Sequence, residues 1–113
     1  MALKIIGQTK VKTLKANFQT EFGLTIRIYD GRSFADDNAT LASIRKEGSK
    51  GGELSPKRNM KVGNLEDKFM EMFGIKTQIA GSDDSYLCDN DLTLAGALEV
   101  DSKKLEKKKT TVK

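Results

Sequence analysis

A chain of 113 residues with 37% hydrophobic residues is long enough for one core, but two independent domains of half that length would each be marginal. Its net charge of +4 is uneven: residues 1–52 carry nine Lys/Arg against five acids, residues 53–100 carry five against nine, and residues 101–113 add six lysines against two acids. There is no histidine, which excludes Ser-His and Cys-His catalysis and the usual zinc ligand, and no apolar run approaches the length of about twenty residues that spans a membrane.

Two segments of the chain follow the same pattern and share six identical positions, KVKTLKANFQTEFG at Lys10–Gly23 and KVGNLEDKFMEMFG at Lys61–Gly74. Their identical residues recur at a constant spacing of 51 residues and include the apolar positions that would face a core. We interpret this pattern as an internal duplication. Because each copy is too short to be stable alone, we expect the two copies to share one core or to pack tightly together.

A main amphipathic helix is predicted in each copy. Its apolar residues recur every four positions, which is the spacing of one helix face, and the residues between them are mostly polar. Such a helix buries one side and exposes the other. The two apolar stripes consist of Leu14, Phe18 and Phe22 in the first copy and Leu65, Phe69 and Phe73 in the second.

The ends of these helices are marked as well. Thr13 and Asn64 stand just before the first apolar residue, where their side chains could accept hydrogen bonds from the first turn, so we predict them as N-caps. Gly23 and Gly74 follow the last phenylalanine of each stripe, and glycine supplies the left-handed residue that closes a helix.

Short strands are predicted on both sides of each main helix, because apolar and polar residues alternate there between turn signals such as Asp30-Gly31. A short helix introduced by an aspartate follows in each copy. The predicted strands are Ala2–Ile6, Thr9–Lys12, Leu24–Tyr29, Ser33–Ala35, Ile75–Ala80 and Tyr86–Cys88, with a short hairpin of Glu53-Leu54 and Asn59–Val62 before the second main helix. The predicted short helices are Ala39–Lys46 and Leu92–Leu98.

These elements predict an α+β fold, in which internally duplicated β-α-β-β-α units form a small mixed or antiparallel sheet with two main amphipathic helices. Residues 1–52 form the first unit and residues 53–100 the second, with Gly48–Gly52 as a flexible linker. Residues 101–113 are charged and low in complexity, so we expect a disordered lysine-rich tail. The sequence leaves open whether the units form separate lobes or one interleaved sheet.

The run RIYDGRSFADDNATLASI at Arg27–Ile44 resembles the stretch of ubiquitin-like β-grasp domains that follows their main helix, and TLKANF at Thr13–Phe18 is similar to the start of that helix. A fainter echo covers Lys61–Leu98. The N-terminal hairpin is short in both copies, and the chain ends in Thr-Val-Lys rather than the Gly-Gly of conjugated modifiers, so conjugation chemistry is not carried over. The resemblance implies a small scaffold that binds partners through its sheet.

Few residues could carry chemistry. Cys88 has no candidate base and lies on a predicted strand, which favours a buried thiol over a reactive one. Asp83, Asp84, Asp89 and Asp91 could offer oxygen ligands to a cation, but they lack the spacing of a calcium loop, so turn and capping roles are favoured. We expect no catalytic residue, no metal site and no cofactor.

One set of residues could form a partner-binding surface: Arg27, Tyr29, Arg32 and Arg45. Arg27 and Tyr29 share one face of a predicted strand, and they point outward if the neighbouring isoleucines point inward. An exposed Arg/Tyr pair suits binding to a protein or nucleic acid, although an ordinary solvated strand face would have the same composition.

We therefore expect a non-enzymatic protein-interaction or adaptor module, located in the cytoplasm because a single cysteine suits a reducing compartment. The alternative is a nucleic-acid-associated accessory protein that uses the basic first copy and the lysine-rich tail. The tail could also bind an anionic membrane surface, or it could serve only to keep the protein soluble. The partner and the oligomeric state stay open. The opposite charges of the copies predict that the acidic copy faces the basic one, within a chain or between chains.

Overall fold

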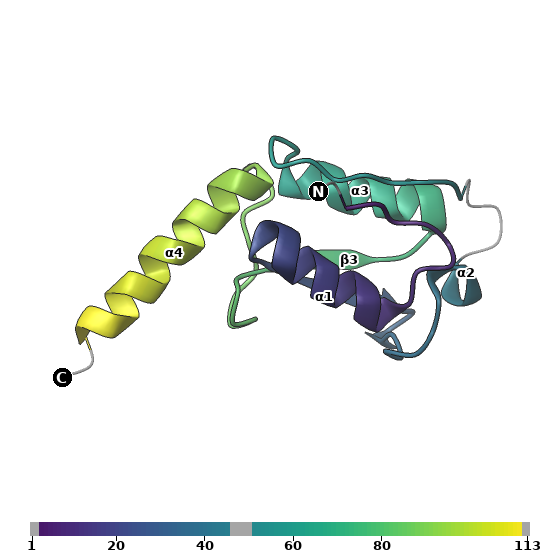
Figure 1. Cartoon of the computed structure of the whole chain (residues 1–113), viewed down its shortest axis with the longest axis horizontal. Helices are drawn as coiled ribbons and strands as arrows, with labels where there is room; N and C mark the ends of the chain where they lie inside the picture. Colours follow the sequence, from purple (N-terminus) through teal and green to yellow (C-terminus); the bar gives the residue numbers. More distant parts are fainter. Residues whose placement is uncertain (1–2, 46–50, 112–113) are drawn as a thin grey trace.

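The computed structural model describes residues 3–45 and 51–111, with side chains as far as residue 104. Over these residues the fold is α+β, with four helices and a three-stranded antiparallel sheet (Figure 1), which confirms the α+β part of the prediction. The elements are α1 (Val11–Phe22), β1 (Thr25–Asp30), β2 (Ser33–Phe34), α2 (Leu41–Ile44), α3 (Val62–Phe73), β3 (Thr77–Ala80) and α4 (Leu94–Thr111).

A single sheet joins the two halves of the chain. Its order is β2-β1-β3, so the central strand β1 pairs with β2 from its own half on one side and with β3 from the other half on the other. In the β1–β3 pair, Ile26 lies opposite Ile79 and Arg27 lies opposite Gln78. The halves are therefore interleaved through the sheet.

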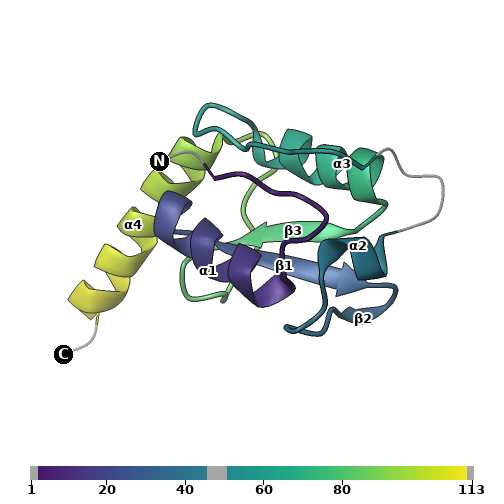
Figure 2. The same ribbon diagram turned by 45° about the vertical axis from the view of Figure 1, so that its right-hand side comes forward.

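The core lies between the sheet and two helices. Figures 1 and 2 show α1 and α3 on the same side of the sheet, and the buried side chains of β1, Ile26 and Ile28, point to that side. One buried cluster contains residues of both halves. All six predicted stripe residues are at most 3% exposed, which confirms them as core: Leu14, Phe18, Phe22, Leu65, Phe69 and Phe73.

The helices end where the sequence predicts. Gly23 has a φ of 68° and Gly74 a φ of 64°, and both are in the left-handed conformation that suits glycine. Each glycine donates its N–H to a carbonyl in the last turn, that of Gln19 and that of Met70. The predicted glycine closures are thus confirmed.

The starts of the two main helices correct the prediction. They begin at Val11 and Val62 without any side-chain cap, so Thr13 and Asn64 are not the N-caps. The N–H of Val11 instead donates to the carbonyl of Ala39, at 2.9 Å. A loop distant in sequence thus satisfies N–H groups that a capping side chain would otherwise bind.

Backbone hydrogen bonds recur at matching positions of the two halves. The bond from Val11 to Ala39 has its match from Val62 to Leu92, at 2.8 Å. Both connect the start of a main helix to the loop that precedes the short helix of the same half. Further matched donors are Lys12 and Gly63, Leu41 and Leu94, Ala42 and Ala95, and Ala35 and Cys88.

Several predicted short elements are smaller in the structure. Leu87 makes a single bridge with Ala80, and Ile5 makes one with Leu54, in place of two predicted strands. Thr9–Lys12 is not a strand, because α1 has already begun within it. The first short helix is limited to α2. Residue 46, the last of the predicted short helix, lies outside the described residues. Residues 48–50 of the predicted linker also lie outside them.

The C-terminal helix is longer than expected. The sequence predicts a disordered tail from residue 101, whereas α4 continues to Thr111 and points away from the rest of the molecule in Figures 1 and 2. Asp101 anchors the helix where the predicted tail begins, because it is 1% exposed and its side chain accepts hydrogen bonds from the Ser82 N–H and the Tyr86 hydroxyl. None of the described helices is long and apolar enough to cross a membrane.

Candidate functional site

The sheet face opposite α1 and α3 carries no helix among the described residues, and we call it the open face. Side chains alternate along a strand, so the residues between the buried isoleucines of β1 point to it. Neighbouring strands add the residues paired with them. The open face consists of Thr25, Arg27, Tyr29, Phe34, Lys76, Gln78 and Leu87.

A stacked aromatic pair stands at one end of the open face. The ring of Phe34 lies 5.0 Å from that of Tyr29 at an interplanar angle of 22°, and Phe34 is 65% exposed. The Tyr29 hydroxyl donates to the Gln78 side-chain oxygen at 2.6 Å, and the Lys76 ammonium lies 5.5 Å from the Tyr29 ring centroid. Tyr29 is therefore held by contacts with Phe34, Gln78 and Lys76, and the stacking keeps the Phe34 ring in an exposed position.

An ion pair lies near the middle of the open face. The Arg27 Nε donates to the Asp84 carboxylate at 2.6 Å, and a second guanidinium nitrogen donates to the Asp84 carbonyl at 3.0 Å. The hydrogen bond to Asp84 raises the pKa of Arg27. These bonds anchor the Gly81–Ser85 turn at a residue whose φ is 60°.

The four residues predicted as a binding surface do not form one cluster. Arg27 and Tyr29 share the open face, and Arg32 is exposed in the turn between β1 and β2, at the edge of that face. Arg45 lies elsewhere, because its guanidinium packs against Gly51, so closely that a methyl group on that glycine would collide with it.

Five residues of the open face were not predicted as site residues: Thr25, Phe34, Lys76, Gln78 and Leu87. The predicted hairpin turn at Asp30-Gly31 contained the signal for Phe34, because a short hairpin places it opposite Tyr29. No local sequence pattern predicted that Lys76 and Leu87 lie on the open face. They join the face only because β3 pairs with β1 across the two halves.

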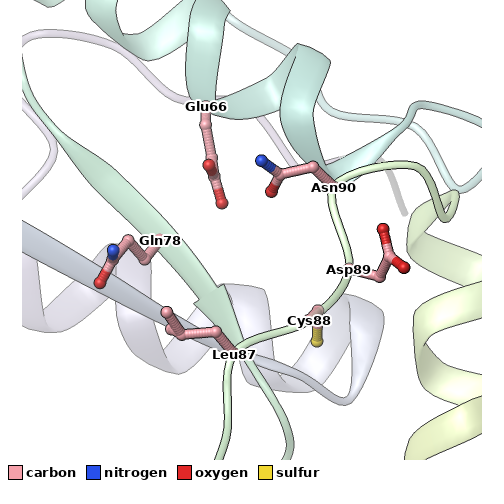
Figure 3. Close-up of a pocket in the computed structure, with 6 residues that line it drawn as sticks. All are labelled: Glu66, Gln78, Leu87, Cys88, Asp89 and Asn90. Atoms are coloured by element: carbon pink, nitrogen blue, oxygen red, sulfur yellow. The ribbon is translucent and has the colours of Figure 1, made fainter.

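A cavity of about 370 Å³ lies beside β3 (Figure 3), lined by Glu66, Gln78, Leu87, Cys88, Asp89 and Asn90. Glu66 and Asn90 point toward each other, while the Cys88 sulfur points away from both. The Glu66 carboxylate accepts the backbone N–H of Ile79 at 3.2 Å, and burial raises the pKa of Glu66. Glu66 thus caps a free donor at the edge of the sheet.

The acidic residues near this cavity serve local turns. Asp83 accepts the N–H of Ser85, and Asp89 accepts the N–H of Asp91, which confirms the turn roles predicted for these two aspartates. Within the described ranges, no group of three or more His, Cys, Asp or Glu side chains is placed to hold a metal ion.

Cys88 is buried, as predicted, with 8% of its surface exposed. Burial raises the pKa of its thiol to about 11 from the ordinary 9.0, so the thiolate fraction at neutral pH falls roughly 100-fold. We expect iodoacetamide at pH 7.5 to label native Cys88 at least ~100-fold more slowly than Cys88 of the urea-unfolded chain. Mass spectrometry of timed samples measures both rates; equal rates would contradict a buried, protonated thiol.

Comparisons with protein-family models, with curated proteins and with solved structures found no match. We therefore interpret the molecule from its own geometry. The open face offers exposed apolar side chains and charges to a large partner, whereas the cavity offers mainly carboxylate and amide groups.

Proposed function

We propose that this protein is a non-enzymatic interaction module whose open face binds a protein partner. The observation that carries this proposal is Phe34, which is 65% exposed and yet held in place by Tyr29. Full burial of a phenylalanine side chain contributes about 1.5–3 kcal/mol, so a partner that covers Phe34 gains binding free energy. Leu87, 48% exposed, offers a second apolar contact on the same face.

The fixed position of the aromatic pair also supports the proposal. Binding costs conformational entropy when interface side chains must be ordered, and the contacts of Tyr29 with Gln78 and Lys76 supply that order before any partner arrives. An aromatic anchor surrounded by polar and charged side chains is the usual composition of a binding hot spot.

We also propose that the chain arose by duplication of a β-grasp-like unit and works in the cytoplasm. The matched hydrogen bonds of Val11 and Val62 support the duplication, together with the common spacing of the identical residues. The order of main helix, hairpin and short helix supports the β-grasp resemblance, although no N-terminal hairpin occurs among the described strands. The single cysteine, a free thiol, supports the location.

The test is affinity capture with the tagged chain and its Phe34→Ser/Leu87→Ser variant. We expect the wild type to retain specific proteins and the variant to lose them at least ~tenfold, because both apolar contacts are removed. Ile6→Ser is the matched control, since Ile6 is 38% exposed and lies in the N-terminal segment, outside the sheet and its open face. Equal retention by the wild type and both variants would reject the open face as the binding site.

A nucleic-acid-associated role is the second candidate, and α4 favours it. This helix points away from the body and exposes Lys103 and Lys104. Contacts with phosphate groups need such cations. They do not account for the exposed Phe34, which a protein partner would cover. Salt-sensitive binding of generic RNA or DNA that Lys103→Glu/Lys104→Glu removes would favour this candidate over a protein partner.

A further inference from the structure

The two ends of the open face are related by the pairing of β1 with β3. Arg27 and Gln78 lie directly opposite each other and are separated by the same 51 residues as the identical residues of the two halves. The pairs on either side of them are matched: Ile26 with Ile79, and Ile28 with Thr77. A local two-fold axis of the sheet therefore passes between Arg27 and Gln78.

An exposed apolar side chain stands at each end of this axis-related face. Phe34 is paired with Tyr29 at one end, and Leu87 is bridged to Ala80 at the other. Tyr29 and Ala80 are again 51 residues apart, so Phe34 and Leu87 hold corresponding places at similar distances from the centre. We call these the Phe34 end and the Leu87 end.

The charges of the two ends are opposite. Arg32 and Lys76 are exposed at the Phe34 end, with Asp30 as the exposed acid beside them. At the Leu87 end, the exposed acids are Asp83 and Asp84 in the turn that precedes Leu87, and Asp89 just after it. Two cations lie there as well, Arg27 paired with Asp84 and Lys104 beside Leu87, so the acids outnumber the bases at this end. The halves differ in the same sense, with nine Lys/Arg against five acids in residues 1–52 and five against nine in residues 53–100.

We infer that the partner of the open face is a second copy of this chain, turned end for end. Rotation about an axis through the middle of the interface places the Phe34 end of each copy on the Leu87 end of the other. Both ends of both copies are then used, so the assembly closes as a dimer and does not grow into a fibre. The other face-to-face rotation would bring like charges together and is disfavoured.

This inference rests on the proposed function, because it names the partner of the same open face. Charge complementarity is what selects a second copy: each copy carries both the basic and the acidic contact that the other one needs. The apolar residues Phe34 and Leu87 would be covered together, which removes both exposed apolar side chains of the face from water.

The test uses two charge-reversal variants of the full chain in sedimentation equilibrium. Arg32→Glu/Lys76→Glu makes both ends acidic, and Asp84→Asn/Ser85→Lys makes both ends basic, with asparagine chosen because it tolerates the positive φ of residue 84. We expect the wild type to dimerise, with a dissociation constant at least ~tenfold higher at 0.5 M than at 0.05 M salt. Each variant alone should be at least ~tenfold weaker, because like charges then face each other.

A mixture of the two variants tests whether opposite charges at the two ends drive dimer formation. An equimolar mixture should form a heterodimer with near wild-type affinity, since acidic ends then meet basic ends, and misfolded variants could not give this result. A wild type that stays monomeric up to about 1 mM at low salt overturns the inference, as does a mixture that stays monomeric.

The same variants separate this inference from the proposed function. If the wild type is monomeric but captures another protein that Phe34→Ser/Leu87→Ser loses, the dimer is rejected and the interaction module stands. If a single-stranded RNA oligomer binds the monomer and Arg32→Glu/Lys76→Glu abolishes that binding, the Phe34 end is a nucleic-acid site and both are rejected. If the wild type neither dimerises nor captures another protein, the open face has no partner and both proposals are rejected.

Discussion

Replacing Phe69 with alanine should lower the free energy of unfolding by about 3–5 kcal/mol. The Phe69 side chain is fully buried in α3, with its ring 5.9 Å from that of Phe73, in the cluster that both halves share. The loss combines the transfer free energy of the aromatic ring with the cavity left behind. Because a domain of this size has a total stability of about 5–15 kcal/mol, the variant should be marginal. Urea unfolding followed by circular dichroism measures the change.

Met70→Ala is the matched control for this experiment. Met70 is the next residue of the same helix, but it is 52% exposed, so its truncation should change the free energy of unfolding by less than about 1 kcal/mol. Both substitutions leave alanine in the helix, so differences in helix propensity are small. A loss of less than about 1 kcal/mol for Phe69→Ala would show that this residue is not part of the core.

Replacing Asp101 with alanine should loosen the contact between α4 and the Gly81–Ser85 turn, while Leu94 and Ala97 still hold the start of the helix in the core. The Asp101 carboxylate accepts the Ser82 N–H at 3.1 Å and the Tyr86 hydroxyl at 3.0 Å, and it is 1% exposed. Each buried donor left without a partner costs about 1–3 kcal/mol. We expect a loss of stability of that order and faster hydrogen exchange in α4, with smaller changes in α1 and α3.

Two variants complete this test. Ser102→Ala alters the exposed neighbour and should leave exchange in α4 unchanged, whereas Asp101→Asn keeps an acceptor oxygen and should recover part of the loss. Uniform acceleration across all helices in Asp101→Ala would argue against a local anchor. Mass spectrometry of exchange reports each helix separately.

The pH dependence of Tyr86 has a defined sign. Burial, followed by the hydrogen bond to Asp101, raises the pKa of Tyr86 above its ordinary value of 10.0. The folded state therefore holds the Tyr86 proton more tightly than the unfolded state. This contribution to stability is complete below pH 10 and is lost as the pH rises above it.

Local sequence signals predicted much of the core and the helix ends. The spacing of Leu14, Phe18 and Phe22 correctly predicted the buried face of α1, because residues four apart lie on the same side of a helix. Glycine after the last phenylalanine fixed the stop, since few other residues adopt a φ near 68°. Alternation in β1 likewise indicated which side chains point away from the core.

Features that depend on long-range contacts escaped prediction. Thr13 has the chemistry of an N-cap, but the carbonyl of Ala39 accepts the N–H of Val11, and the helix begins three residues earlier than predicted. The predicted tail begins inside α4, where Asp101 is bonded to Ser82 and Tyr86, residues that no local sequence pattern connects with it. Three of the seven residues of the open face escaped prediction for the same reason, because the pairing of β3 with β1 is what brings them there: Lys76, Gln78 and Leu87.

The pairing of β1 with β3 also has a consequence for folding during synthesis. β1 ends at Asp30, and its partner strand begins at Thr77, so the ribosome must add almost half the chain before the sheet can close. At about 5–20 residues per second, that interval lasts roughly 2–10 s. During this interval α1 can pack on β1 of its own half, but β1 has no partner on the side that β3 later occupies. An unpaired strand edge can pair with other chains, so the nascent first half exposes such an edge until the second half has emerged.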